Sequence, residues 1–208
     1  MVVYRAEQAI PRFLVHFSKG GDAAVYATPP DVLGGGVKCR RILAADLRGA
    51  NDTKELHDFN FVLGEFVRLL VGVSPPKVNQ VDVYESPVVE AAFSAKRADF
   101  ERGGQKADQI WVFHGTGKPG GVEAICSGGF KVGGQDVDVA HGTAYGQGVY
   151  TATGPSTPMT YGQLILCKAL PGKAGLQGVG DSWKPRVDDD WVIFREAAQL
   201  WPKFVVHF

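Results

Sequence analysis

Hydrophobic residues recur at three- and four-residue steps in the first half of the chain, which is the spacing of one helix face. Between positions 54 and 71 these residues are Leu56, Phe59, Leu63, Phe66 and Leu70. The pattern predicts a helix over 54–71, with Asp52 and Glu55 forming a capping box at its start. The sequence VGVSPPK then ends the helix, because glycine and a proline pair do not continue one.

A second helix is predicted to begin at Ser86-Pro87, since serine caps a helix N-terminus well and proline fits the first helical turn. Its pattern runs to about residue 101, and a short apolar stretch at 81–84 precedes it. Farther upstream, RFLVHFSKGGDAAVYA at 12–27 predicts two short strands around a glycine turn. The segment that follows them, PPDVLGGG, has the composition of a loop.

After residue 108 the helical spacing gives way to short apolar runs separated by turn residues. The predicted strands are QIWVF (109–113), FKV (130–132), GVYTA (148–152), QLILCKAL (163–170), WVIF (191–194) and KFVVHF (203–208). Brief helices are predicted near 122–127 and 155–161. Because the longer helices come early and the strands follow without regular alternation, the pattern predicts an α+β fold.

Pro75-Pro76 is the strongest break inside the chain. We therefore expect an N-terminal mixed α/β segment, 1–75, packed on a C-terminal domain, 76–208. The function of the N-terminal segment cannot be read from its residues.

The charge balance argues against a partner that attracts the whole chain by its charge. Lys+Arg and Asp+Glu both number 22, so the formal charge is zero, and nothing attracts the chain as a whole to nucleic acid or to an anionic membrane. No apolar run approaches the ~20 residues of a membrane-spanning helix, and no secretory signal pattern stands at the start. We expect an intracellular protein, cytoplasmic or nuclear, with no membrane partner.

Cysteine and histidine usage predicts no metal site. The three cysteines are Cys39, Cys126 and Cys167. They are too few and too scattered for a zinc site or a disulfide framework, so we expect reduced, buried residues. Asp136, Asp138 and His141 lie close together, but in a glycine-rich loop, and the other histidines lack metal-ligand spacing. Glycine is abundant, with 27 of 208 residues against a usual ~7%, which indicates close backbone approach to a ligand.

The sequence WVFHGTGKPGG at 111–121 contains the G-x-G-x-x-G pattern of a dinucleotide-binding βαβ turn. The pattern follows a predicted strand, and Asp136 lies about 20 residues beyond it, as that turn requires. However, it begins past the midpoint and leaves too little chain for a doubly wound sheet. The next helix, VEAICS, is under two turns long, and the helical crossovers that parallel strands need are missing. A hydride-transfer fold is therefore a poor interpretation.

Read with the residues after it, the same stretch fits a different set of motifs. FHGT at 113–116 ends a strand in an apolar-His-Gly-Ser/Thr pattern, and a short helix and Gly129-Phe130 follow. YGQGVY at 145–150 has the pattern aromatic-Gly-x-Gly-aliphatic-Tyr, and a further aromatic residue, Tyr161, lies eleven positions later. LCKALPG at 166–172 and DWVIF at 190–194 then come in order, before a final apolar strand.

In these motifs the chain resembles the poly(ADP-ribose) polymerase-like, or diphtheria-toxin-like, ADP-ribosyltransferases. The resemblance covers 79–208, and HGTAYGQGVY is similar to the mono-ADP-ribosylating members. It implies split antiparallel β-sheets of the ADP-ribosyltransferase fold, with the N-terminal helical or mixed segment packed on them. It also implies that NAD is a substrate, cut between nicotinamide and ribose, and that no metal is needed.

The resemblance assigns roles to five residues. His114 would bond the adenine-side ribose, and Gly115 would bind the nicotinamide carboxamide through its backbone, with Thr116 completing the motif. Tyr150 and Tyr161 would hold the nicotinamide ring between them, and each offset aromatic pair contributes about 0.5–1.5 kcal/mol beyond area burial. We expect His114 and Tyr150 to be catalytic, together with a carboxylate from the third motif.

That carboxylate is Asp190 in the alignment with the third motif, where polymerising members carry glutamate. Aspartate is shorter by one methylene, and a misplacement of about 1 Å can cost on the order of 100-fold in rate, so we expect mono-transfer or plain hydrolysis. If the third motif is aligned differently, Glu196 is the alternative carboxylate. The small hydroxyl residue that bonds the carboxamide in many members is replaced by Pro158, and either Thr157 or Thr160 is the candidate to take its place.

The sequence therefore predicts an NAD-dependent mono-ADP-ribosyltransferase. The acceptor is left open and includes a protein side chain, a nucleic-acid end or a small molecule. Two alternatives remain at this point: an NAD glycohydrolase that transfers the ribosyl group to water, and an inactive module that binds NAD or ADP-ribose.

Overall fold

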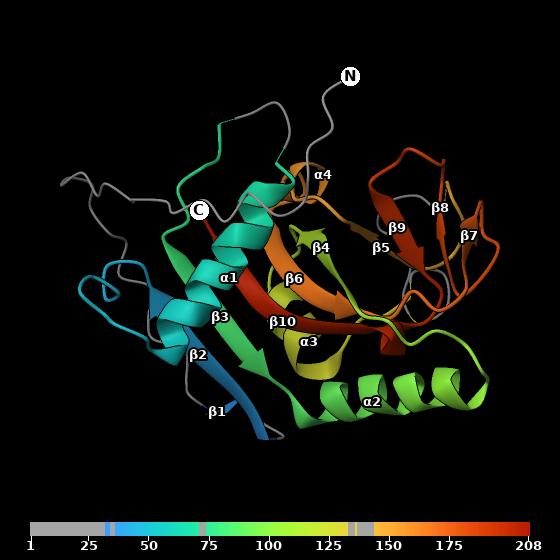
Figure 1. Cartoon of the computed structure of the whole chain (residues 1–208), viewed down its shortest axis with the longest axis horizontal. Coiled ribbons are helices and arrows are strands. Elements are labelled where there is room, and N and C mark those ends of the chain that lie inside the picture. The colour runs from blue at the N-terminus through green and yellow to red at the C-terminus, as the bar shows by residue number, and fades with distance from the viewer. Residues whose placement is uncertain (1–31, 34–35, 71–73, 133–135, 137–143) are drawn as a thin grey trace.

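The structure is a computed structural model that describes residues 32–33, 36–70, 74–132, 136 and 144–208 (Figure 1). Ten strands in these residues form one sheet in the order β1-β2-β3-β10-β6-β4-β5-β9-β8-β7. Their bounds are β1 Val32–Leu33, β2 Val37–Leu43, β3 Gln80–Glu85, β4 Ile110–Thr116, β5 Val149–Ala152, β6 Gln163–Ala169, β7 Ala174–Leu176, β8 Ser182–Lys184, β9 Trp191–Phe194 and β10 Leu200–His207. All described neighbours pair antiparallel except β7 and β8. The predicted α+β class is confirmed.

Helices cover both faces of this sheet. Their bounds are α1 Lys54–Arg68, α2 Pro87–Arg102, α3 Gly121–Gly128, α4 Ser156–Met159 and the 3-10 helix η2 Ala197–Gln199. Figure 1 shows α1 across the front of the sheet and α3 behind it. Phe59, Val62 and Phe66 of α1 are buried in the front core, and Val122 and Cys126 of α3 in the back core. No described helix has the length and apolar character needed to cross a membrane.

The two long helices form where the apolar spacing predicts them, but one cap differs from the prediction. The Thr53 hydroxyl accepts a hydrogen bond from the Leu56 backbone N–H (3.2 Å), so Thr53 is the N-cap of α1. The predicted box of Asp52 and Glu55 was therefore wrong by one residue. Asp52 contacts His57 instead (2.7 Å).

The Ser86 cap of α2 is confirmed, with its hydroxyl accepting from the Val89 N–H (3.5 Å). The same hydroxyl donates to the Ser127 carbonyl oxygen (2.7 Å), which ties the start of α2 to the end of α3. This bond joins two elements that lie 41 residues apart in the chain.

Three strand expectations need comment. Residues 130–132 form no strand, because the Val132 N–H bonds the Asp136 carboxylate (2.8 Å) and Phe130 packs into the back core. The PPDVLGGG loop contains the two-residue strand β1, and strand β2 was not predicted. The hairpin expected at 12–27 lies outside the described residues.

Strand β2 belongs to the N-terminal side of Pro75-Pro76 but pairs with β3 over six positions, from Lys38↔Glu85 to Leu43↔Gln80. Residues on both sides of the proline pair therefore contribute to one sheet. Strand β4 pairs antiparallel with β5 and with β6, which agrees with the rejection of a βαβ dinucleotide-binding turn.

The sheet is nearly divided between β4 and β5. Strand β4 pairs with β6 at all seven of its positions but with β5 only at Phe113↔Ala152. One part of the sheet thus comprises β1, β2, β3, β10, β6 and β4, and the other comprises β5, β9, β8 and β7. The candidate residues of the first and second motifs lie on the two strands that meet at this single pair.

Candidate functional site

His114 lies on β4, one residue past the pair that joins the two parts of the sheet. Its Nδ1 is 2.8 Å from the Tyr150 carbonyl oxygen on β5. Because a carbonyl oxygen can only accept a hydrogen bond, Nδ1 carries the proton in the neutral ring. Burial lowers the pKa of His114, and the bond to Tyr150 opposes this shift only in part. His114 is therefore neutral at pH 7, with the Nε2 lone pair as an acceptor.

The ring of His114 is also held from the side. Phe130 meets it edge to face, with ring centroids 4.9 Å apart and an interplanar angle of 80°. Phe130 follows α3 and is buried in the same core as Val122 and Cys126. Helix α3 thus fixes the orientation of the histidine through the Gly-Phe step that the sequence motif contains.

Gly115 lies against the short helix α4. A Cβ on Gly115 would overlap the Pro158 carbonyl oxygen, so no other residue fits without moving α4. A Cβ on Gly117 would lie 2.6 Å from the Tyr161 carbonyl oxygen. Gly117 is therefore required by the same close approach of α4 and the residues after it to β4.

Helix α4 brings its own polar groups to this approach. The Thr160 hydroxyl donates to the Thr157 carbonyl oxygen (2.7 Å), whereas the Thr157 hydroxyl makes no hydrogen bond within the described residues. The Ser156 hydroxyl oxygen is buried and has no partner in the same part of the chain. Sequence reasoning missed Ser156, although it stands only two positions before Pro158.

The Tyr150 hydroxyl is fully engaged. It donates to the Gly146 carbonyl oxygen (2.8 Å) and accepts from the Tyr145 N–H (3.1 Å). The Trp191 ring contacts both tyrosines edge to face, at 6.2 Å from Tyr150 and 5.8 Å from Tyr145. These contacts fix the Tyr150 ring. Tyr161, by contrast, is 45% exposed at the end of α4.

Asp190 directly precedes β9. Its carbonyl oxygen accepts from the Thr153 N–H (2.8 Å), and its carboxylate would touch a Cβ on Gly154 (3.4 Å). Burial raises the pKa of Asp190, and the Asp189 charge adds to this, while the backbone N–H of Asp190 and the Lys184 ammonium oppose it. The fold therefore disfavours the charged form of this carboxylate.

The structure brings some of the predicted residues together and leaves others apart. His114 contacts the Tyr150 backbone directly, and Gly115 contacts α4. Asp190 comes three residues before Ile193, the β9 residue that pairs with Tyr150. Glu196 lies at another place, where it accepts from Lys96 of α2 (2.6 Å). Thr116 pairs with the first residue of β6, Gln163.

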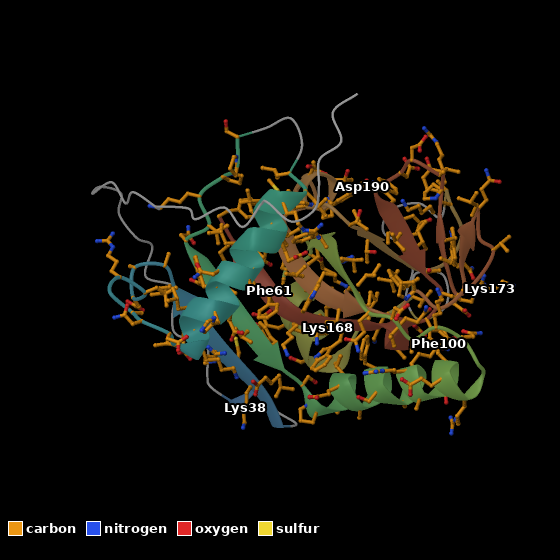
Figure 2. All side chains as sticks on the ribbon, in the orientation of Figure 1. Lys38, Phe61, Phe100, Lys168, Lys173 and Asp190 are labelled. Carbon is orange, nitrogen blue, oxygen red and sulfur yellow. The ribbon has the colours of Figure 1, made fainter. Side chains whose placement is uncertain are left out.

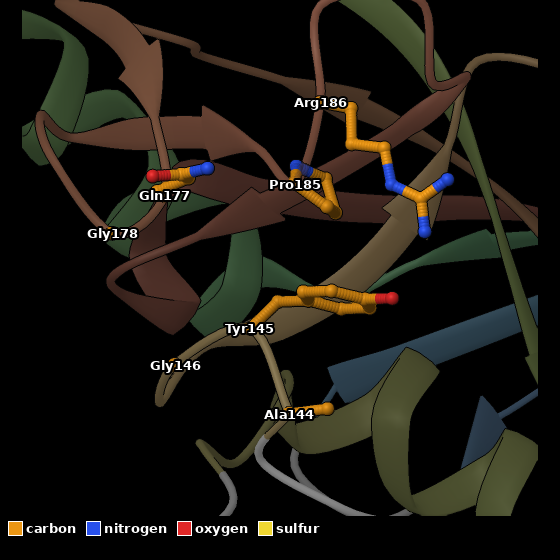
Figure 3. A pocket seen from close by; sticks show the side chains of 7 residues that line it. All are labelled: Ala144, Tyr145, Gly146, Gln177, Gly178, Pro185 and Arg186. Atoms are coloured by element: carbon orange, nitrogen blue, oxygen red, sulfur yellow. The ribbon is translucent and has the colours of Figure 1, made fainter.

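A pocket of about 450 Å³ opens beside the Tyr145–Gly146 turn (Figure 3). It is lined by Ala144, Tyr145, Gly146, Gln177, Gly178, Pro185 and Arg186. None of the residues predicted for NAD lines it, but Tyr145 and Gly146 both bond the Tyr150 hydroxyl. No local sequence pattern predicts this pocket, because three separate segments form it.

Comparisons with known proteins add no relative. The chain matches no protein-family model, and no curated protein matches it. Within the described residues, no group of three or more His, Cys, Asp or Glu side chains is arranged to hold a metal ion.

Proposed function

We propose that this protein is an NAD-dependent mono-ADP-ribosyltransferase with the ADP-ribosyltransferase fold. The observation that carries the proposal is the 2.8 Å contact between His114 Nδ1 and the Tyr150 carbonyl oxygen. It joins the histidine of the first motif to the tyrosine of the second across the place where the sheet is nearly divided. The motifs alone predict which residues take part, whereas this contact bears on their arrangement.

The contact also matches the chemistry that NAD requires. The neutral His114 ring offers Nε2 as an acceptor, and a ribose hydroxyl is a donor. Had Nδ1 faced a donor, the ring would have offered N–H at Nε2 and would have suited a phosphate better. The arrangement therefore favours a sugar hydroxyl as the partner of His114.

In the reaction, the bond between the nicotinamide nitrogen and ribose C1′ breaks, and nicotinamide leaves with the bonding electron pair. The ribose carries positive charge until the acceptor oxygen or nitrogen attacks C1′ and loses its proton. Tyr150 and Tyr161 would hold the ring of the leaving group. Asp190 would stabilise the positive charge and accept a hydrogen bond from the other ribose or from the acceptor.

The carboxamide contact that Pro158 lacks has a candidate in Ser156. Its buried hydroxyl has no partner in the described structure, and an unsatisfied buried polar group costs about 1–3 kcal/mol. A bound carboxamide would supply the missing partner. Thr157 is the second candidate, and Thr160 is already bonded to the helix backbone.

The decisive experiment incubates the purified protein with NAD and measures nicotinamide release and acceptor labelling. We expect release with labelling, and we expect His114→Ala to reduce release by about 100-fold, because the ribose loses its fixed position. His57→Ala, an exposed histidine on α1, is the matched control and should release nicotinamide normally.

The other outcomes separate the alternatives. Release without labelling of any acceptor would indicate an NAD glycohydrolase. Binding of NAD without release would indicate a binding module. Full activity in His114→Ala would contradict the proposed site.

A further inference from the structure

A row of aromatic and basic side chains crosses three strands between α1 and α2. Trp111 on β4, Lys168 on β6 and Trp201 on β10 are direct cross-strand neighbours, so their side chains share one face. The Lys168 ammonium lies 5.6 Å from the centre of the Trp111 ring and 5.5 Å from that of Trp201. Figure 2 shows Lys168 on the sheet between the two helices.

A β-bulge adds a second lysine. The pairing of β10 with β6 shifts between Pro202 and Phe204, which leaves Lys203 as the extra residue. The Lys203 ammonium is 4.6 Å from the centre of the Trp201 ring. Two ammonium groups therefore gather at one indole. Burial lowers the pKa of Lys203, and the charge of Lys168 lowers it further.

Among the described residues, neither Lys168 nor Lys203 has a carboxylate partner within 4.0 Å. Lys96, whose side chain is also largely buried, does have one in Glu196. Asp58, Glu90 and Glu85 act on Lys203 from farther away, and Asp58 is already bonded to Arg40 (2.6 Å).

The Trp201 indole N–H is also buried without an acceptor in this part of the chain. Unpaired buried donors are rare and call for an explanation. Three donor groups thus gather at the Trp201 ring, and none of them has an acceptor among the described residues.

We propose that this row, Trp111, Lys168, Trp201 and Lys203, binds the phosphate of a small phosphomonoester that carries a planar ring. A phosphomonoester has a charge of about −1.5 to −2 at pH 7, which matches two ammonium groups. Lysines bind phosphate as point charges, and two ammonium groups match a phosphate dianion better than the single charge of a carboxylate. Phe61, which is 37% exposed and 4.9 Å from Trp111, offers an aromatic surface for the ring.

This site is separate from the proposed NAD site. Side chains alternate along β4, so Trp111 and Phe113 face the core under α1, whereas Val112 faces the opposite core. His114 shares the face of Val112 and contacts Phe130 there. The two sites lie on opposite faces of one strand.

The test titrates the full chain with phenyl phosphate, inorganic phosphate and phenol, followed by calorimetry and by the fluorescence of the tryptophans. We expect phenyl phosphate to bind more tightly than inorganic phosphate, and phenol not to bind. Lys168→Gln and Lys203→Gln should each weaken phenyl phosphate binding by about tenfold or more. Phe61→Leu should weaken phenyl phosphate but leave inorganic phosphate unchanged.

The controls make the outcome specific. Lys38→Gln and Lys173→Gln, at exposed lysines away from the row (Figure 2), should bind normally. Lys168→Arg should keep binding, because the charge remains. His114→Ala should bind phenyl phosphate normally, whichever way the NAD experiment ends. Absence of binding to the natural chain, or equal binding by both glutamine variants after their folding is verified by circular dichroism, would overturn the proposal.

Discussion

Two histidines on one sheet, His207 and His114, are held by hydrogen bonds to different kinds of acceptor. His207 on β10 contacts Asp82 (3.0 Å), and Arg41 reaches the same carboxylate (3.0 Å), as does the Gln80 amide (2.9 Å). His114 on β4 donates to a backbone carbonyl and has no described partner for Nε2. In the first network, three side chains all bond the Asp82 carboxylate. In the second, Nε2 of His114 remains available as an acceptor for a ligand.

The difference extends to the surroundings. Around Asp82 a buried carboxylate is matched by donors, so its charged form is favoured. On α4 and beside β9, by contrast, the Ser156 hydroxyl has no partner among the described residues, and burial disfavours the charge on Asp190. Buried polar groups without a hydrogen-bond partner, and buried carboxylates whose charged form is disfavoured, are typical of ligand sites. Buried groups whose hydrogen bonds and charges are all paired are typical of structural networks. The comparison thus separates a matched network in the β2–β3–β10 region from the β4–β5 region, where we propose the NAD site.

The largest expected effect breaks the matched network. Asp82→Asn removes the buried negative charge that pairs with Arg41 and His207, which should cost about 3–5 kcal/mol of the free energy of unfolding. Denaturant unfolding of the variant measures this loss. Asp99→Asn, at an exposed position on α2, is the control and should change little.

The same carboxylate predicts an acid dependence. Burial alone would raise the pKa of Asp82, but hydrogen bonds from His207 and Arg41 lower it overall. Its stabilisation should be complete above the ordinary aspartate pKa of about 3.9 and be lost as the pH falls through the lower native value. The stability difference between the natural chain and Asp82→Asn should therefore shrink below about pH 4. A constant difference down to pH 2 would contradict this assignment.

A smaller effect should follow from Gly115→Ala, because the new methyl group overlaps the Pro158 backbone. Forcing a group into a packed place costs about 1–3 kcal/mol, and α4 must move. Thermal unfolding gives the stability loss, and nicotinamide release reports the displacement of α4. Gly128→Ala adds a methyl group in open space on α3 and serves as the control.

The smallest expected effect has the opposite sign. Because the pKa of Asp190 is raised, its charge opposes folding at neutral pH, and Asp190→Asn should raise the melting temperature slightly at pH 7. The gain should shrink as the pH falls through the raised native pKa and disappear well below the ordinary value of about 3.9, where aspartate is protonated in both states. The variant should also lose nicotinamide release; a variant that is destabilised at pH 7 and fully active would contradict both assignments.

Much of the fold followed from local patterns. The apolar spacing over 54–71 and the Ser86-Pro87 pair identified α1 and α2, because helix periodicity and capping depend on near neighbours. Strand β2 was missed for the opposite reason. Arg40 and Arg41 interrupt its alternation, and each is matched by carboxylates that lie 15 to 41 positions away. No local pattern can show such partners.

The candidate site divides in the same way. Its residues are named by the motifs at 113–116 and 145–150, but the Nδ1 contact, the tautomer that it implies and the unpaired Ser156 hydroxyl depend on strands and helices that meet in space. The pocket beside Tyr145 and the lysine pair at Trp201 likewise draw on separate segments.

The sequence by itself determined the α+β class and the two long helices, and it predicted His114, Gly115 and Tyr150 as one set of site residues. Only the tertiary structure decided that β2 joins the sheet across Pro75-Pro76 and that β4 and β5 meet at one pair. The physical reason is that periodicity and capping act over a few residues. Burial, charge matching and close backbone approach are instead settled between segments that only folding brings together.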